Sequence, residues 1–164
     1  MTFERTRILY GDAACEKIRG ARVAVCGVGA VGSFAVEALA RLGVENFELF
    51  DFDVFDISNI NRQLCALNST VGKPKVEVQK ARILDINPAA RVEAHNVFID
   101  DTLAEQIAQS RPTVIVDAID SIASKVALAK RALGADTAIV SSMGAARRRN
   151  PRMAEVADIF KTYG

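Results

Sequence analysis

The polar residues of this chain that could do chemistry fall into a few groups separated by apolar segments. The first is the glycine loop Gly27-Val28-Gly29-Ala30-Val31-Gly32. The rest are, in chain order, Asp51 and Asp53, then Asn59, Arg62 and Gln63, then Lys75 and Asp120. Backbone N–H groups of a glycine loop bind phosphate oxygens, cationic side chains neutralise them, and a carboxylate can hold Mg²⁺. Together these residue types predict a site for the phosphates of a nucleotide.

The glycine loop joins an expected strand, residues 22–26, to an expected helix, residues 31–42. A GxGxxG motif is informative in this context. We expect Gly27 to permit the tight turn, Gly29 to let a phosphate approach the backbone, and Gly32 to allow close packing of helix on strand. The alternative is that the three glycines serve only a tight turn. The motif alone does not decide between a nicotinamide dinucleotide and ATP.

Asp51 lies 19 residues after Gly32, at the end of an expected second strand. An acid at this place commonly accepts hydrogen bonds from ribose hydroxyls. Asp53 follows in the same loop, and we count it among the nucleotide-binding residues. A nicotinamide-dependent dehydrogenase would share both the glycine loop and this acid, so the next loop has to separate the two classes.

The irregular segment 52–72 carries side chains that a dinucleotide site does not need. Arg62 offers a planar fork suited to phosphate oxygens, and Asn59 and Gln63 offer amide hydrogen bonds. A long polar connection of this kind usually marks a functional loop. This loop favours ATP over a dinucleotide.

Lys75 is expected in the first turn of a helix over residues 74–84. A cation there opposes the helix dipole and costs about 0.3–1 kcal/mol. We therefore expect a bound polyphosphate to compensate for it. The alternative is a solvated lysine that tolerates the cost.

Asp120 follows a strand expected over residues 113–117, just past the carboxyl edge where open α/β sheets bind ligands. Mg²⁺ takes one or two carboxylates together with phosphate oxygens and water, so Asp120 is the predicted metal ligand. Its alternative role is the N-cap of the next helix. Asp117, still within the strand, is expected to be a structural acid satisfied by backbone N–H groups.

Strand-like and helix-like segments alternate along the chain, which predicts an α/β, Rossmann-like fold with a mostly parallel sheet and helices on both faces. We expect a single nucleotide-binding domain over residues 1–164. Further strands are expected at 46–50, 91–96, 137–141 and near 154–159, and further helices at 102–109, capped by Asp101 or Thr102, and 121–133.

Composition argues against several other classes of protein. Half of the residues are hydrophobic, a quarter are charged and the net charge is +1, so no global field points to nucleic acid or a membrane. No apolar run approaches the roughly 20 residues that span a bilayer, and no signal or transit sequence is evident. We expect a cytoplasmic protein without membrane contact. Cys15, Cys26 and Cys65 lack the spacing of a disulfide framework or a zinc site.

The motifs GVGAVG, DFD, SNINRQ, VGKPK and DAIDS, in this order, resemble the superfamily of ubiquitin-activating-type adenylating enzymes. That superfamily includes the activators of the molybdopterin and thiamine sulfur carriers. The resemblance implies ATP and Mg²⁺ as cofactors, with Arg62 and Lys75 as catalytic residues. It also implies a homodimer contacted through the N-terminal arm, residues 1–20. Arg7, or Arg5 close to it, would then reach the partner's ATP.

Several stretches look most like the tRNA threonylcarbamoyladenosine dehydratases, among them residues 4–11, 61–64, 86–88, 117–121 and 141–145. This similarity implies adenylation of the carboxylate on a modified adenosine of tRNA, followed by loss of AMP and closure of a cyclic ester-like ring. Arg147, Arg148 and Arg149 could touch RNA phosphates. The alternative acceptor is the C-terminus of a ubiquitin-like sulfur carrier, with a sulfur-carrier or cysteine desulfurase-associated partner.

Two departures from the dehydratase pattern stand out. Cys65 occupies a position where these dehydratases commonly have His, and we interpret it as a neutral loop change. The C-terminal part of the family's domain is expected to be absent from this chain. A non-catalytic ATP-binding remnant therefore remains an alternative to an active enzyme.

Overall fold

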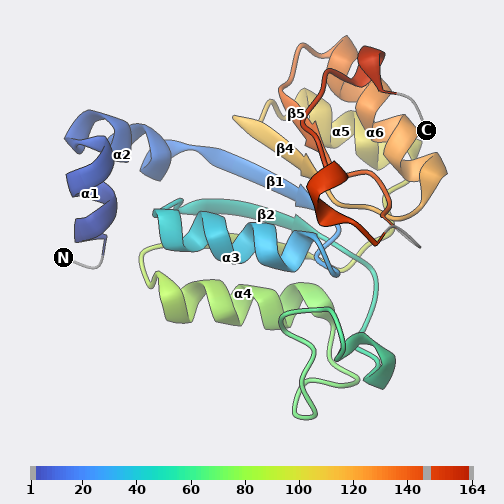
Figure 1. Ribbon diagram of the computed structural model, residues 1–164, viewed down its shortest axis with the longest axis horizontal. Coiled ribbons are helices and arrows are strands. Elements are labelled where there is room, and N and C mark those ends of the chain that lie inside the picture. The colour runs from blue at the N-terminus through green and yellow to red at the C-terminus, as the bar shows by residue number, and fades with distance from the viewer. Residues whose placement is uncertain (1–2, 146–148, 163–164) are drawn as a thin grey trace.

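The computed structural model describes residues 3–145 and 149–162 (Figure 1). Its helices are α1 (Glu4–Tyr10), α2 (Asp12–Gly20), α3 (Gly32–Leu42), α4 (Lys75–Ile86), α5 (Asp101–Gln109) and α6 (Ile122–Gly134). Its strands are β1 (Arg22–Cys26), β2 (Asn46–Phe50), β3 (Arg91–His95), β4 (Val114–Asp117) and β5 (Ile139–Ser141). No helix among these is long and apolar enough to cross a bilayer.

The five strands form one sheet in the order β3-β2-β1-β4-β5, and every neighbouring pair is parallel. The predicted α/β, Rossmann-like class is confirmed. The chain moves from β1 to β2 on one side and later returns to β4 on the other side of β1. Such a reversal opens a crevice at the carboxyl ends of the two central strands, where ligands of open sheets bind.

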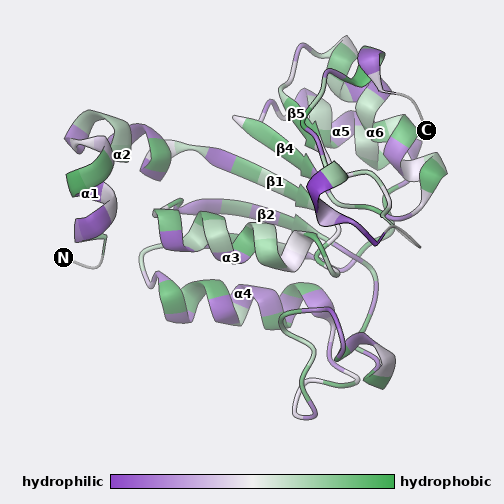
Figure 2. Ribbon diagram, in the orientation of Figure 1, coloured by the Kyte–Doolittle hydropathy of each residue, from purple (hydrophilic) through white to green (hydrophobic). Residues whose placement is uncertain are grey.

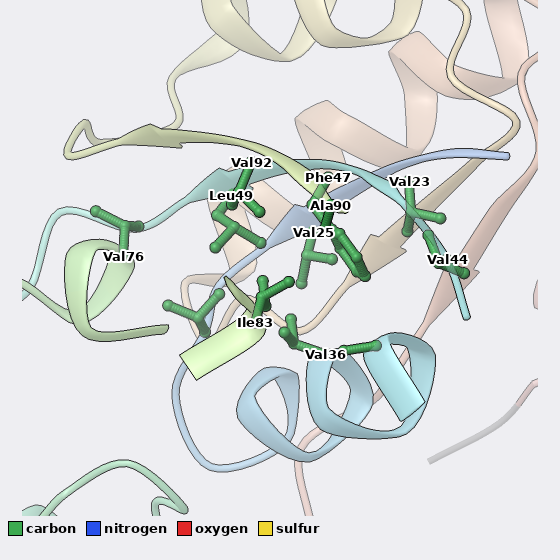
Figure 3. Close-up of a cluster of buried hydrophobic side chains, with 12 residues drawn as sticks. Val23, Val25, Val36, Val44, Phe47, Leu49, Val76, Ile83, Ala90 and Val92 are labelled. Carbon is green, nitrogen blue, oxygen red and sulfur yellow. The ribbon is translucent and has the colours of Figure 1, made fainter. Parts of the chain in front are cut away.

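Helices cover both faces of the sheet because its central strands are apolar on both faces (Figures 1 and 2). Val23 and Val25 of β1 pack with Phe47 and Leu49 against α3 and α4 (Figure 3). Ala24 and Cys26 of β1 belong to the opposite core, which α5 and α6 cover. The two cores fix the helices that begin at the carboxyl edge, and with them the loops of the site.

Most expected boundaries agree with the structure to within one or two residues. The cap of α5 is a correction: Asp100, rather than Asp101 or Thr102, accepts the N–H of Leu103 at 2.8 Å. Asp100 is the residue with extended backbone, which a capping side chain requires. The helix therefore begins one residue earlier than the pattern indicated.

The strand expected near 154–159 is wrong. Two short 3₁₀ helices, Pro151–Met153 and Ile159–Lys161, lie there instead. Val156 is fully exposed and Phe160 is 81% exposed, so these apolar residues find no core. A strand needs a neighbouring strand to satisfy its backbone, and this segment pairs with none of the described residues.

The arm formed by α1 and α2 leads into the amino end of β1 (Figure 1). Neither helix buries a residue. Ile8, Leu9 and Tyr10 are each more than half exposed. The arm contacts the rest of the chain through Phe3, whose ring lies beside Gly43, through Ile18, which packs against the first core, and through the Arg19 carbonyl, which accepts from Asn46 Nδ2 at 3.1 Å.

Candidate nucleotide-binding site

Packing alone requires two of the three motif glycines. Gly27 has φ +86°, and a Cβ there would lie 2.7 Å from the carbonyl oxygen of Ala118. A Cβ on Gly32 would overlap the carbonyl oxygen of Gly27. The N–H of Gly27 donates to the carbonyl oxygen of Phe50 at 2.8 Å. These contacts wedge the glycine loop between the carboxyl ends of β1, β2 and β4, as the sequence predicted for the turn and for the strand–helix packing.

Gly29 has no such packing reason. A Cβ there would meet only the side chain of Gln63, with Nε2 at 3.7 Å, which is ordinary contact. Gln63 is 7% exposed, and its Oε1 atom is buried without a hydrogen-bond partner. An unpaired buried acceptor is costly and calls for an explanation. Gly29 is thus not required by packing, and the Nε2 donor of Gln63 lies beside it, so this part of the loop can accommodate an anionic ligand.

Asp51 ties the glycine loop to the end of β2. Its Oδ2 accepts the N–H of Val28 at 2.9 Å, and its Oδ1 accepts the N–H of Asp53 at 2.9 Å. Burial raises the pKa of the Asp51 carboxyl, while the two backbone N–H groups act to lower it. Each oxygen keeps a second lone pair, so the expected ribose contact remains open to it.

Lys75 is buried rather than solvated, so the alternative of a solvated lysine is wrong. Its side chain is 6% exposed, and Nζ lies 2.7 Å from Oδ2 of Asp53, a side chain that is 47% exposed. The N–H of Lys75 also donates to the carbonyl of Asp53 at 3.0 Å. This ion pair offsets the charge at the start of α4 within the chain itself. The position of Lys75 therefore does not by itself require a phosphate.

Hydrogen bonds between its own side chains and backbone hold the loop after Asp53. Asp56 and Asn59 form a capping box around the 3₁₀ helix Ile57–Asn59, in which Asn59 Oδ1 accepts the N–H of Asp56 at 3.0 Å. Arg62 is exposed, and its Nη1 donates to the carbonyl of Ser58 at 2.9 Å and to Oδ1 of Asn61 at 3.0 Å. Nε and Nη2 of Arg62 donate to no other described residue. The outer half of the guanidinium is thus available to an anion.

Cys65 belongs to the small core of this loop. It packs with Phe55 and Ala66, and its thiol donates to Oε1 of Gln79 at 3.1 Å. Burial raises the pKa of the Cys65 thiol. A protonated, buried thiol fits a packing role better than a nucleophilic one.

Asp117 is fully buried at the end of β4, in agreement with its predicted structural role. The backbone supplies only one bond, from Ile119 N–H to Oδ1 at 3.1 Å. Oδ2 accepts from Lys125 Nζ at 2.8 Å and from Ser141 Oγ at 2.5 Å. Lys125 was not among the predicted site residues. The signal was available, because Lys125 sits near the N-terminus of α6 just as Lys75 does in α4.

Asp120 lies on the exposed loop between β4 and α6. The alternative role as helix cap is wrong, since Ser121 caps α6 by accepting the N–H of Ser124. No hydrogen bond or ion pair among the described residues engages the Asp120 carboxylate. Within residues 3–145 and 149–162, no group of three or more His, Cys, Asp or Glu residues could hold a metal ion. A single free carboxylate is sufficient for Mg²⁺ that is also held by phosphates.

Arg7 is not brought to this site within the chain. It pairs with Glu4 at 2.7 Å and Asp12 at 3.4 Å on the arm, beyond the amino end of β1 (Figure 1). Contact with the ATP of a partner subunit remains a prediction. Arg147 and Arg148 lie outside the described residues, and Arg149 is exposed.

The chain is similar in sequence and in fold to several known proteins. The tRNA threonylcarbamoyladenosine dehydratase of Bacillus subtilis is 47% identical over 161 residues, covering 98% of this chain and 63% of that protein. The crystal structure of the E. coli dehydratase TcdA in complex with ATP matches with a TM-score of 0.94 at 37% identity, covering 98% of this chain and 66% of that one. The molybdopterin-synthase adenylyltransferase of E. coli is 36% identical, covering 81% of this chain and 52% of that protein.

The resemblance inferred from the motifs is confirmed by these matches. The chain spans about three fifths of the length of the dehydratases that it matches, at 63% and 60% for the B. subtilis and E. coli proteins. The ThiF family model matches residues 3–154. The chain therefore belongs to the ThiF family.

Proposed function

We propose that this chain binds ATP with Mg²⁺ and adenylates a carboxylate, namely that of threonylcarbamoyladenosine in tRNA. The observation that carries the proposal is the pair Gly29 and Gln63. Gly29 leaves room for a ligand that packing does not demand, and the Gln63 amide beside it presents Nε2, a donor suited to a phosphate oxygen, 3.7 Å from the position of a Gly29 Cβ. The identity to tRNA threonylcarbamoyladenosine dehydratases supports the choice of acceptor.

The nucleoside of ATP lies over the carboxyl end of β2 in this proposal. Asp51 accepts hydrogen bonds from the ribose hydroxyls. Phe52 and Phe98, an exposed edge-to-face pair with centroids 5.2 Å apart, offer an apolar surface to the base. The phosphates then follow the glycine loop toward the N-terminus of α3, where free N–H groups and the helix dipole favour an anion.

The reaction needs little from the protein beyond alignment and charge neutralisation. A carboxylate oxygen of the acceptor attacks the α-phosphorus without a general base, and pyrophosphate leaves. Arg62 uses the outer half of its guanidinium, and Lys75 uses the ammonium hydrogens not bound to Asp53, to neutralise the phosphates. Asp120, with phosphate oxygens, would hold Mg²⁺, which offsets the negative charge that develops on the leaving pyrophosphate.

Ring closure follows on the same nucleoside. A second nucleophilic group of the threonylcarbamoyl chain attacks the carbonyl carbon of the acyl adenylate. The bond from that carbon to AMP then breaks, and AMP leaves with one oxygen of the original carboxylate. No thioester is needed. Cys26 and Cys65 are buried and Cys15 lies on α2 in the arm, so none of the three is placed for one. ATP and tRNA as substrates suit a cytoplasmic enzyme.

Activation of a ubiquitin-like sulfur carrier is the second candidate. The 36% identity to a molybdopterin-synthase adenylyltransferase favours it, because such an enzyme would use the same ATP site on a different carboxylate. A sulfur carrier or a cysteine desulfurase-associated protein would then be the partner. In either case we expect a homodimer in which the α1–α2 arm contributes Arg7 to the partner's site.

ATP–pyrophosphate exchange tests the proposal. We expect exchange when tRNA carrying threonylcarbamoyladenosine is present and none with tRNA that lacks the modification. Exchange with a carrier protein ending in a free carboxylate, and none with the modified tRNA, would support the second candidate instead. ATP binding without exchange on either acceptor would indicate a non-catalytic ATP-binding chain.

A further inference from the structure

A buried network outside the residues assigned above joins the carboxyl ends of β4 and β5. Its centre is the ammonium group of Lys125, whose side chain is 13% exposed. Nζ donates to Asp117 Oδ2 at 2.8 Å, to Ser141 Oγ at 3.2 Å and to the carbonyl of Ser142 at 2.9 Å. An ammonium group has three hydrogens, so every one of them has an acceptor.

This network continues into the backbone of two loops. The Oδ1 atom of Asp117 accepts a hydrogen bond from the N–H of Ile119, one residue before Asp120. The carbonyl of Asp117 accepts the N–H of Ser142, the first residue after β5. The loop that carries Asp120 and the segment after β5 are therefore tied to the same buried cation.

The two loops occupy the side of the sheet left open by the nucleotide. Asp51 and Phe52 place the nucleoside over β2, and the glycine loop places the phosphates over β1. The acceptor carboxylate must then reach the α-phosphorus from the β4–β5 side. Residues Met143, Gly144 and Ala145 are exposed there. Lys125 is thus bonded to Asp117, which holds the loop of the predicted Mg²⁺ ligand, and to Ser142, at the start of the segment on the acceptor side.

We infer that Lys125 is a positioning residue of the adenylation site: through Asp117 it holds the loop of Asp120, and thereby the Mg²⁺ ligand, in register with the segment after β5. The inference rests on the proposed function. Lys125 does not contact the nucleotide in this arrangement, because all three of its hydrogens are engaged inside the protein. Its effect on Mg²⁺ comes from the fixed position of its neighbours, as for residues that orient metal ligands.

The test is calorimetric titration of ATP into the full chain, once with saturating Mg²⁺ and once with EDTA. In Lys125→Met, the gain in ATP affinity that Mg²⁺ provides should fall roughly tenfold, the range typical of residues that support a metal ligand. Affinity in EDTA should be nearly unchanged, because the glycine loop and Asp51 are untouched. Lys130→Met is the matched control, since Lys130 is exposed on the same helix; it should equal wild type.

Further variants separate positioning from stability. Lys125→Met leaves the buried Asp117 carboxylate without its cation, so the same titration is run on Ser141→Ala, which removes one link without stranding a charge. It should lose a smaller part of the Mg²⁺-dependent gain. The double variant Asp117→Asn with Lys125→Met removes both charges and keeps an acceptor for the Ile119 N–H. Its Mg²⁺-dependent gain should match that of Asp117→Asn alone, because Lys125 acts through Asp117.

A folded Lys125→Met protein with the wild-type Mg²⁺ response would overturn the inference while leaving the proposed function intact. So would a loss equal in Mg²⁺ and EDTA, which would mean general damage to the site. A double variant with a smaller Mg²⁺-dependent gain than Asp117→Asn alone would also overturn it, since Lys125 would then act independently of Asp117. Wild-type protein that bound no ATP would instead reject the proposed function, and the inference with it.

Discussion

The Nζ atom of Lys75 lies 2.7 Å from Oδ2 of Asp53, with the lysine buried and the aspartate half-exposed. This pair places a fully buried cation at the start of α4, at the carboxyl edge of the sheet. Its carboxylate partner still faces solvent. An incoming phosphate can therefore approach the ammonium group from the side of Asp53, which is exposed to solvent.

Replacement of Lys75 should weaken ATP binding. Lys75→Met removes a charge-assisted contact to phosphate, and we expect ATP affinity to fall about tenfold, or roughly 1.4 kcal/mol. Calorimetry in Mg²⁺ measures this. Lys80→Met on the same helix is the control, because Lys80 has no ion pair among the described residues; it should bind ATP as wild type does. Equal affinities of Lys75→Met and Lys80→Met would contradict a phosphate contact by Lys75.

Replacement of Asp53 should lower stability slightly without weakening ATP binding. Asp53→Asn removes a half-exposed carboxylate that competes with the phosphates for Lys75, so ATP affinity should hold or rise, in contrast to the nucleotide-binding role expected for Asp53 from the sequence. The free energy of unfolding should fall by up to about 1 kcal/mol, since an ion pair with an exposed member contributes little. Chemical denaturation and calorimetry on one sample check both. A loss of ATP affinity as large as that of Lys75→Met would show that Asp53 itself holds the nucleotide or its metal.

Gly29→Ala should weaken ATP binding without affecting folding. The added methyl group meets Gln63 only at ordinary contact, so the free energy of unfolding should change by no more than about 0.5 kcal/mol. ATP affinity should fall by about tenfold or more, because the methyl group occupies the space beside the backbone that a phosphate would approach.

Substitutions at two other glycines serve as controls for Gly29→Ala. Gly32→Ala drives its methyl group into the carbonyl of Gly27 and should cost about 3 kcal/mol of stability or more. Gly134→Ala, at the end of α6 with open space around it, should leave both stability and ATP binding intact. If Gly29→Ala bound ATP as Gly134→Ala does, the phosphate would not approach at Gly29.

The helices that begin at the site are joined by Glu37, which accepts from Arg82 at 2.6 and 2.9 Å and from Arg41 at 2.7 Å. The Arg82 guanidinium, followed by Arg41, holds the pKa of Glu37 below its ordinary value of 4.5. The stabilisation is therefore fully present above about pH 4.5 and is lost as pH falls through the lower, folded-state pKa. Glu37→Gln should cost about 1–2 kcal/mol near neutral pH. The difference from wild type, followed by urea denaturation, should shrink in acid; a constant difference would contradict the ion pair.

A mixing experiment tests Arg7. We expect Arg7→Ala and Lys75→Met each to weaken ATP binding as pure dimers. In an equimolar mixture that has exchanged subunits, the mixed dimer carries one site with both residues intact, so about a quarter of all sites should bind at wild-type affinity. A mixture with no tight sites would mean that Arg7 does not act across the dimer.

The edge at which the site forms could be predicted from the sequence because topology follows from simple patterns. The segments at 22–26 and 113–117 are largely apolar on both faces, which indicates parallel strands covered by helices. In a parallel sheet the residues that follow each strand meet at one edge. Gly27, Asp51 and Asp120 were therefore expected there before any contact was known.

The pairings within that edge could not be predicted in the same way. Whether Lys75 reaches Asp53, or Lys125 reaches Asp117, depends on where a helix crosses the end of the preceding strand. Sequence spacing leaves that crossing undetermined. The failed strand near 154–159 has a related cause: its residues have the right types, but strand formation depends on a free sheet edge elsewhere in the molecule.

Direct titration of wild-type protein with ATP and Mg²⁺, beside an identical titration with NAD, tests the central claim most directly. The arrangement of Gly29, Gln63, Lys75 and Asp120 predicts saturable ATP binding that Mg²⁺ strengthens, and no measurable heat with NAD. Tight binding of NAD without binding of ATP would contradict the account.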